Sequence, residues 1–341
     1  MDVNELNAIA RRMVARGKGL LAADESTGTI KKRFDAIGVA NTPENRRDYR
    51  ELLFRTAPAL HEHIGGVILY DETIRQNARD GTPLVKLIED AGAVPGIKVD
   101  AGAKPLAGCP EETITEGLDG LRERFAEYHK LGARFAKWRA VIDIGREIPS
   151  YNAVNANAQA LARYAALAQE ANIVPIVEPE VLMDGDHDIA ACERVTVWVL
   201  KEVFQQLFYA GVVLEGMVLK PNMVLPGMKC AIQNSVEEVA RASVRVLKDC
   251  VPASVAGIAF LSGGQSDEIA TAHLSAMNAM GNLPWPLTFS YGRALQHAPQ
   301  QAWAGKPQNV ASAQKAFAHR ALMNSLAATG KWTEADERRA S

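Results

Sequence analysis

The fold is decided by four apolar runs: RFAKWRAV (residues 134–141), VPIVEPEV (174–181), LEGMVLKP (214–221) and GIAFLSGG (257–264). Each run has the length and composition of a buried strand and is followed by turn signals and a helical pattern. Polar residues near the ends of these runs recur at intervals of 41, 42 and 42 positions: Lys137, Glu178, Lys220 and Ser262. One strand plus one helix accounts for each interval, so the spacing predicts repeated strand–helix units.

Four further runs extend this order toward both ends of the chain: GLLAAD (19–24), GVILYD (66–71), VPGIKVD (94–100) and PLTFSYGR (286–293). The segments between runs have helical spacing and helix start signals, such as the capping box formed by Ser235 and Glu238. Eight strand–helix units predict an α/β fold, a single (β/α)8 TIM barrel. An open doubly wound sheet is the alternative, but no GxGxxG follows an early strand.

No Pro-, Ser- or Gly-rich linker divides the chain, so we expect one catalytic barrel domain over residues 1–330. This domain would carry an extra N-terminal helix and a C-terminal helical extension. The last eleven residues, KWTEADERRAS (331–341), are mostly polar, and we expect this tail to be disordered.

The composition is that of a globular protein: 341 residues, 48% hydrophobic and 23% charged. Lys plus Arg number 38 and Asp plus Glu 40, so the net charge of −2 provides no global field for nucleic acid or anionic membranes. The four cysteines form no CxxC pair, which predicts neither a disulfide framework nor a four-sulfur zinc site. The start of the chain lacks an apolar signal segment, and no apolar run approaches ~18 residues. We expect a cytoplasmic protein, with a cleaved organellar transit peptide left open.

Chemistry in such a barrel is expected at the C-terminal ends of the strands. Reading those ends gives Asp24, Asp71, Lys98, Asp100, Lys137, Arg139, Glu178, Glu180, Lys220, Ser262, Ser290 and Arg293. A single strand lysine is usually a surface or edge residue. Lys220 differs, because three apolar residues lead into it and a proline follows. This pattern is typical of a buried strand that stops abruptly.

A buried lysine at a barrel mouth suggests Schiff-base catalysis. An ordinary lysine with a pKa of ~10.4 is neutral in only about one molecule in 2500 at pH 7, so burial and a neighbouring cation are needed. Lys137 and Arg139 are the expected cations. Proton transfers in imine formation, dehydration and carbon–carbon cleavage would fall to the carboxylates Asp24, Glu178 and Glu180.

Two anion sites are expected at the same mouth. The run Ser262-Gly263-Gly264 leads from a strand into a helix, where backbone N–H groups and the helix dipole favour phosphate. Ser290, Gly292 and Arg293 follow the eighth strand and add a guanidinium. The second cationic cluster contains Lys98, Arg33, Ser26 and Thr29, although Ser26 also fits a helix cap.

Two acidic and histidine-containing segments could suggest a metal. His61 and His63 stand two positions apart in a predicted helix and do not share a face. The loop DGDHD (184–188) fits a helix cap before an amphipathic helix that begins near Ile189. We therefore expect neither a metal nor another cofactor.

Seven segments of the sequence resemble class I fructose-1,6-bisphosphate aldolases over roughly residues 3–330. They are GKGLLAADESTG (17–28), KVDAG (98–102), FAKWRAV (135–141), PIVEPEVLMDGDHD (175–188), LKPNMVLPG (219–227), FLSGGQS (260–266) and TFSYGRALQ (288–296). The resemblance implies cleavage of fructose 1,6-bisphosphate in glycolysis, its reversal in gluconeogenesis, and a homotetramer.

The resemblance also implies roles for individual residues. Lys220 would form the Schiff base, with Glu178 as the acid and base for carbinolamine dehydration. Asp24 would handle the C4 hydroxyl proton, and Lys137 would assist imine formation. One phosphate would be bound by Ser262, Gly263, Ser290 and Arg293, and the other near Lys98, Ser26 and Arg33.

Two departures from the family pattern are visible. Thr29 stands where serine is usual, which keeps the hydroxyl. Family members with a long tail end in a tyrosine that helps protonate the enamine, whereas the last tyrosine here is Tyr291, which leaves the donor for that step open. The alternatives are another Schiff-base sugar-phosphate lyase or transferase, and a binding protein that keeps the fold without turnover.

Overall fold

The computed structural model describes residues 1–339. Eight parallel strands close into a barrel in the order β1-β10-β9-β8-β7-β6-β3-β2. These strands are β1 (Gly19–Ala23), β2 (Ile64–Leu69), β3 (Val94–Lys98), β6 (Phe135–Ile142), β7 (Val174–Val181), β8 (Val218–Leu219), β9 (Gly257–Phe260) and β10 (Leu287–Tyr291). The TIM-barrel prediction is confirmed.

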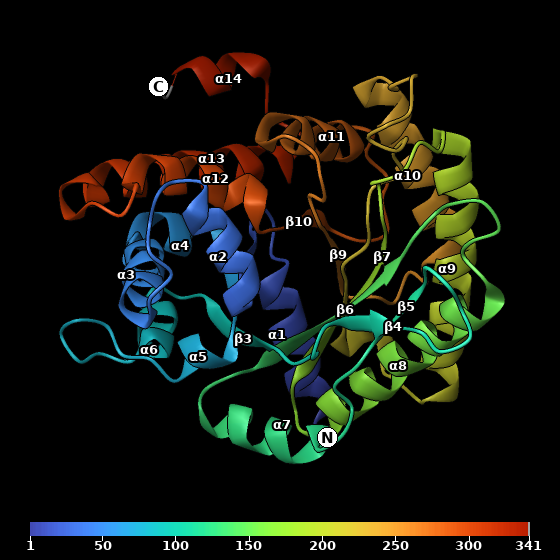
Figure 1. The fold of residues 1–341 in the computed structure, drawn as a ribbon, viewed down its shortest axis with the longest axis horizontal. Helices are drawn as coiled ribbons and strands as arrows, with labels where there is room; N and C mark the ends of the chain where they lie inside the picture. Colours follow the sequence, from blue (N-terminus) through green and yellow to red (C-terminus); the bar gives the residue numbers. More distant parts are fainter. Residues whose placement is uncertain (340–341) are drawn as a thin grey trace.

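Helices surround the barrel, as Figure 1 shows. The first seven are α1 (Val3–Met13), α2 (Thr27–Asp35), α3 (Pro43–Phe54), α4 (Ala57–His63), α5 (Asp71–Ile74), α6 (Leu84–Asp90) and α7 (Leu121–Lys130). The others are α8 (Tyr151–Glu170), α9 (Ile189–Tyr209), α10 (Val236–Cys250), α11 (Asp267–Ala279), α12 (Arg293–Trp303), α13 (Val310–Ala327) and α14 (Glu334–Arg339). None of the described helices is both long and apolar enough to cross a membrane.

The predicted helix caps are present. Ser235 and Glu238 form the reciprocal capping box at the start of α10. Asp188 accepts a hydrogen bond from the Ala191 N–H at the start of α9, as expected for the loop at 184–188. These side chains satisfy N–H groups that have no partner within the helix.

Two predictions about elements are wrong in detail, and one pair of strands was not predicted. The run at 214–221 forms a 3-10 turn, η1 (Leu214–Gly216), followed by a strand of only two residues. The last strand ends at Tyr291, so Arg293 is the first residue of α12. An antiparallel pair that the sequence analysis missed, β4 (Ala103–Pro105) and β5 (Thr113–Thr115), lies outside the barrel.

The C-terminal tail is ordered over most of its length, contrary to the expectation of disorder for 331–341. Residues Glu334–Arg339 form α14, and the Glu337 carboxylate accepts hydrogen bonds from Arg320 at 2.7 Å and from Trp332 Nε1 at 3.0 Å. Arg320 is buried, so this ion pair fixes the tail against the body of the protein. The end of the tail, 340–341, lies outside the described residues.

The period-2 alternation of the strands builds the barrel interior. Side chains from facing strands meet in one buried cluster: Leu20, Ala22, Ile68, Val94, Phe135, Val174, Ile176, Val218 and Ala259. The helix α1 contributes Leu6, Ala10 and Met13 to the same cluster, at spacings of four and three residues. The expected N-terminal helix therefore closes the barrel at the N-terminal ends of its strands, while the polar residues gather at the opposite ends.

Candidate active site

Side chains alternate between the two faces of each strand, and this alternation places the functional side chains in one cavity. On β7, Val174 and Ile176 belong to the interior cluster, and Glu178 and Glu180 continue the same face toward the strand's C-terminal end. In the same way Lys137 follows Phe135 on β6. Lys220 follows Val218 with the same two-residue step after β8.

This cavity has a volume of about 280 Å³, and fifteen of the sixteen residues that were given a catalytic or binding role line it, whereas the strand-end residues Asp71 and Asp100 do not. The fifteen are Asp24, Ser26, Thr29, Arg33, Lys98, Lys137, Arg139, Glu178, Glu180, Lys220, Ser262, Gly263, Ser290, Gly292 and Arg293. The exception is Gly264, whose N–H faces Met183 Sδ at 3.1 Å. Gly264 is therefore not among the residues that line the cavity, contrary to the sequence-based expectation.

Two lysines and two carboxylates form a buried chain at the base of the cavity. Lys220 Nζ lies 3.1 Å from Glu178 Oε1, and Lys137 Nζ lies 3.4 Å from Glu178 Oε2. Lys137 Nζ also contacts Asp24 Oδ2 at 2.8 Å. The side chains of Lys220, Lys137 and Glu178 are at most 5% exposed. The Lys220 amino group thus contacts a carboxylate that the Lys137 amino group also contacts.

The charges in this chain fix the protonation of Asp24 and Lys137. Burial by itself raises the pKa of Asp24, but the attraction of Lys137 and Lys220 is stronger and brings the pKa to about 2. Burial likewise opposes the charge on Lys137, but Asp24 and Glu178 raise its pKa above the ordinary lysine value. At neutral pH, Asp24 is therefore a carboxylate and Lys137 an ammonium ion.

Arg139 and Glu180 form a second ion pair on the cavity wall. The Nε–H of Arg139 donates to Glu180 Oε2. Burial lowers the pKa of Arg139, but Glu180 more than compensates and raises it. The Arg139 backbone N–H donates to Asp100 Oδ2 at 3.2 Å, which fixes this part of β6. At the mouth, the Arg139 guanidinium can bind a hydroxyl or an anion, and the Glu180 carboxylate can accept a hydrogen bond from a hydroxyl.

The expected phosphate loop lies between β9 and α11. Gly263 has φ +56°, a conformation that glycine adopts without strain. Arg293 Nη2 donates to Gly263 O at 3.2 Å and to Gln265 O, so the guanidinium lies beside the loop. Ser290 Oγ is buried and has no hydrogen-bond partner among the described residues. A phosphate oxygen would satisfy this hydroxyl group.

The second cationic cluster lies at the ends of β1 and β3. Lys98 Nζ pairs with Asp100 Oδ1 at 2.8 Å. Ser26 Oγ and Thr29 Oγ1 lie 3.1 Å apart at the start of α2, where Ser26 is the N-cap residue. Arg33, on the same helix, donates to Glu25 Oε1.

The sequence analysis missed Glu25, which also lines the cavity. Its carboxylate accepts hydrogen bonds from Arg33 and from Gln296 Nε2, the latter at 2.7 Å, and lies 3.6 Å from buried Arg50. Its position next to Asp24, before a helix that carries Arg33, was the only available signal. The carboxylate orients Arg33 at the mouth.

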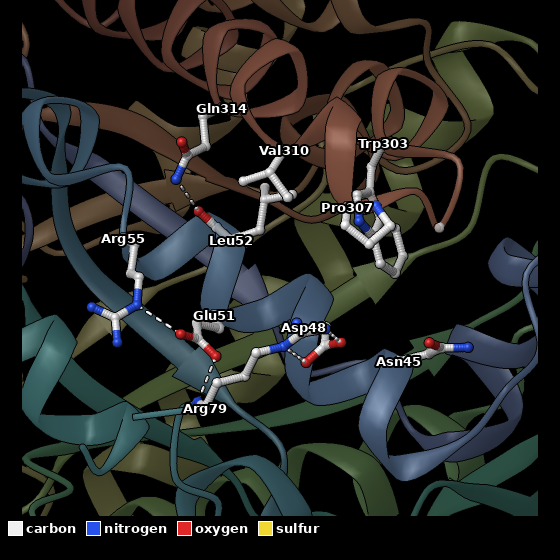
Figure 2. A pocket seen from close by; sticks show the side chains of 11 residues that line it. Asn45, Asp48, Glu51, Leu52, Arg55, Arg79, Trp303, Pro307, Val310 and Gln314 are labelled. Carbon is white, nitrogen blue, oxygen red and sulfur yellow. Dashed lines mark hydrogen bonds and ion pairs between the residues drawn. The ribbon is translucent and has the colours of Figure 1, made fainter. Parts of the chain in front are cut away.

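A second cavity, of about 270 Å³, lies between α3 and the segment around η2 (Pro307–Asn309). Figure 2 shows Arg55 and Arg79 turned toward the acidic residues of α3. Arg55 donates to Glu51 at 2.7 Å, and Arg79 pairs with Asp48. These charges compensate one another, and no lysine lines the cavity, so it provides no amine nucleophile.

No group of three or more His, Cys, Asp or Glu side chains within 1–339 is arranged to hold a metal ion. His61 and His63 lie in α4, as the sequence predicts. Asp188 is used as the cap of α9.

The comparison with known families decides between the remaining alternatives. Residues 5–341 match the sequence model of fructose-bisphosphate aldolase class-I. The chain belongs to the class I fructose-bisphosphate aldolase family. It is therefore a lyase, and the family's reaction is the cleavage of fructose bisphosphate.

Relatives of this aldolase cover nearly its whole length. A probable fructose-bisphosphate aldolase class 1 from Xanthomonas campestris pv. campestris is 58% identical over 333 residues, which are 97% of this chain and 99% of that protein. The non-muscle type aldolase of Lethenteron camtschaticum is 54% identical, over 97% of this chain and 91% of that protein.

A solved structure has the same fold as this aldolase. It is fructose-bisphosphate aldolase from Plasmodium falciparum, in complex with TRAP and a small-molecule inhibitor. It superposes with a TM-score of 0.95 at 49% identity, covering 97% of this chain and 96% of that one. The family resemblance predicted from the seven segments is thus confirmed.

Proposed function

We propose that the cavity cleaves fructose 1,6-bisphosphate reversibly to dihydroxyacetone phosphate and glyceraldehyde 3-phosphate, through an imine on Lys220. The observation that carries the proposal is the buried contact of Lys220 with one carboxylate oxygen of Glu178. Lys137 contacts the other oxygen of the same carboxylate. A nucleophilic amine, a proton-transfer group and a fixed ammonium ion are what imine chemistry requires.

Imine formation would begin when Lys220 gives a proton to Glu178, 3.1 Å from Nζ, and the resulting neutral amine adds to C2 of the open-chain ketose. A proton then passes from the nitrogen to the C2 oxygen, which gives a carbinolamine. Glu178 returns its proton to the C2 hydroxyl, so that water leaves and an iminium ion forms. The Lys137 ammonium ion, 3.4 Å from the same carboxylate, stabilises its anionic form after the transfer.

Cleavage of the C3–C4 bond would follow removal of the C4 hydroxyl proton by Asp24. The electron pair of the breaking bond moves into the iminium group and gives an enamine, while C4 becomes the aldehyde carbon. Protonation of the enamine at C3 and hydrolysis of the imine then release dihydroxyacetone phosphate. Asp24 suits the first step because Lys137 and Lys220 keep it ionised.

The barrel order supports a position for each phosphate. β9 is the immediate neighbour of β8, so Ser262 and Gly263 lie on the strand end next to Lys220. The phosphate nearest the imine carbon would bind there, with Arg293 and Ser290. Lys98, Ser26 and Arg33 lie on the side of β1 and β3 and would receive the other phosphate.

The proposed reaction uses no metal, because the iminium group withdraws the electrons that a metal-dependent aldolase draws toward its ion. Activity should be unchanged after prolonged incubation with EDTA and gel filtration. Loss of activity on chelation, restored by added zinc, would overturn the imine mechanism.

We extend the proposal to the cellular setting that the family resemblance implies: a cytoplasmic homotetramer in glycolysis and gluconeogenesis. The proposed substrate site needs no cofactor. Light scattering on the eluting protein during gel filtration tests the tetramer, since the chain mass is 36.9 kDa. A mass near one or two chains would contradict it.

The decisive experiment is borohydride reduction in the presence of dihydroxyacetone phosphate, followed by mass mapping of the modified peptide. We expect the label on Lys220. Lys220→Ala should abolish labelling and lower kcat by several orders of magnitude while the protein stays folded. A label on Lys98 or Lys137 would show that the nucleophile is assigned to the wrong residue.

A further inference from the structure

A buried glutamine–histidine contact lies behind the phosphate loop. Gln265 follows the loop, and His273 lies on the second turn of α11. Both side chains are buried, with exposures of 6% and 4%. His273 Nδ1 and Gln265 Oε1 are 2.6 Å apart. Neither residue has a part in the proposed proton transfers.

The direction of each hydrogen bond follows from the partners. Gln265 Nε2 donates to the Ser262 carbonyl at 3.0 Å, and a carbonyl can only accept. The amide oxygen therefore faces His273, whose Nδ1 must carry the proton. Burial lowers the pKa of His273 to about 4, so at pH 7 the ring is neutral.

Further hydrogen bonds of Gln265 link the first residue of the loop, Ser262, to the residue that follows the loop. The Gln265 side chain and its own backbone N–H, at 3.2 Å, both bind the Ser262 carbonyl. The Gln265 carbonyl accepts from Arg293. Gln265 thus connects three groups: the Ser262 carbonyl, the Arg293 guanidinium that is proposed to bind phosphate, and His273 on α11. If the amide rotated away, the Ser262 carbonyl would lose a partner and the loop would gain freedom.

We infer that Gln265 and His273 are positioning residues, which hold the Ser262–Gly263 loop in the conformation that receives phosphate. The inference rests on the proposed function, because it takes this loop as a phosphate site. His273 acts through Gln265, and Gln265 acts through the Ser262 carbonyl. Neither touches substrate. A fixed loop binds an anion more tightly than a mobile one, because less conformational entropy is lost on binding.

The test compares two ketones that differ only in the phosphate. Dihydroxyacetone phosphate and dihydroxyacetone are each titrated for the concentration that gives half-maximal borohydride labelling. The matched variants are His273→Asn and His273→Leu. Asparagine carries an amide nitrogen at the position of Nδ1 and can still donate to Gln265, whereas leucine has the same size and no donor.

For His273→Leu we expect a three- to tenfold rise in the half-labelling concentration of the phosphorylated ketone. This equals about 0.7–1.4 kcal/mol, the range of one hydrogen bond. The value for dihydroxyacetone should stay within about twofold. His273→Asn should restore the phosphorylated ketone to near the parent value, and KM for the bisphosphate should rise in His273→Leu with little change in kcat.

Two further variants guard against a general folding defect. Gln265→Met keeps the chain length and neutrality, removes both hydrogen bonds, and should reproduce the His273→Leu effect. Ser275→Ala is the matched control, because Ser275 lies on the same helix but donates to the Trp332 carbonyl instead. It should behave as the parent with both ketones.

Calorimetric titration with inorganic phosphate separates this inference from the imine proposal. Weaker phosphate binding in His273→Leu and Gln265→Met, with recovery in His273→Asn, would support the pair even if Lys220 is not the nucleophile. Equal losses for both ketones, or unchanged affinity for phosphate and dihydroxyacetone phosphate in both variants, would overturn the positioning role.

Discussion

Lys137 is the residue on which the electrostatics of the site depend. It contacts Asp24 at 2.8 Å and Glu178 at 3.4 Å, and it belongs to an eight-residue strand that continues past it toward the mouth. The attraction of Lys137 and Lys220 for Asp24 outweighs burial and keeps this carboxylate charged. Without the Lys137 ammonium ion, burial would favour protonation of Asp24.

We predict that Asp24→Asn changes the acid sensitivity of folding. A carboxyl with a lowered pKa in the folded state stabilises the protein above its ordinary pKa, and the contribution is lost as pH falls through the folded value. For Asp24 this window runs from the ordinary aspartate pKa of 3.8 down to the folded-state pKa of about 2, and the shift corresponds to about 2 kcal/mol. Urea unfolding between pH 6 and pH 2 should show a steeper loss of stability for the parent. Parallel curves would contradict the assigned pKa.

We predict that Arg293→Ala impairs phosphate binding more than imine chemistry. A guanidinium beside the Ser262–Gly263 loop makes charge-assisted hydrogen bonds worth roughly 1.5–3 kcal/mol each. KM for fructose 1,6-bisphosphate should therefore rise about ten- to a hundredfold, with kcat falling less. Steady-state kinetics measure both, and labelling with dihydroxyacetone should be unaffected. An unchanged kcat/KM would make Arg293 a structural residue of the loop.

At this scale the sequence predicted most of the site because alternation along a strand is a local property. Phe135 and Val174 are apolar and two-residue steps lead from them to Lys137 and Ile176, then to Arg139 and Glu178. The prediction that Gly264 lines the cavity was wrong because the direction of this residue is not set by strand alternation. Its direction depends on the turn at Gly263 and on Met183, which is 81 positions away.

At the scale of elements, the structure adds a fixed C-terminal helix. The sequence 331–341 has few apolar residues, and polar tails usually fray. Here Glu337 reaches Arg320 and Trp332, so one buried ion pair orders the segment. Arg320 lies 17 positions before Glu337 and on a different helix, so this contact cannot be seen from the composition of the tail. The two-residue β8 was missed for a related reason, because an apolar run does not distinguish a strand from a 3-10 turn.

We predict that Glu337→Gln releases α14. The change removes a charge-assisted contact with Arg320, worth roughly 1.5–3 kcal/mol. Limited trypsin digestion should then cut after Lys331, which is exposed, about tenfold faster or more. Glu334→Gln, on the exposed face of the same helix, is the control and should be cut at the parent rate. Equal rates for both variants would show that Glu337 does not fix the helix.

At the scale of the whole molecule, the barrel can close around a large interior side chain only where the neighbouring strands carry small residues. A Cβ on Gly96 would lie 2.3 Å from the ring of Phe135, and one on Gly66 would lie 2.9 Å from it. Phe135 is fully buried in the interior cluster. Two adjacent strands therefore carry glycine where the neighbouring strand carries a ring. Composition does not reveal this pairing, because it depends on the register between β2, β3 and β6.

We predict that Gly96→Ala destabilises the barrel by about 1–3 kcal/mol, because a ring inside the closed sheet has little room to move. Urea unfolding followed by tryptophan fluorescence measures the change. Gly28→Ala is the matched control, since a Cβ there meets no atom within 4 Å. Its stability should be unchanged or slightly raised. A Gly96→Ala protein as stable as the control would mean that the interior tolerates an extra methyl group.

The helix α1, packed by Leu6, Ala10 and Met13 against the barrel interior, closes the end of the barrel opposite the cavity. Substrate and both products would therefore enter and leave at the C-terminal ends of the strands. In the proposed imine mechanism, the half of the sugar held on Lys220 would stay in the cavity while the free half leaves, so the two products would depart in a fixed order. A molecule large enough to cover this opening would slow the forward and reverse reactions alike.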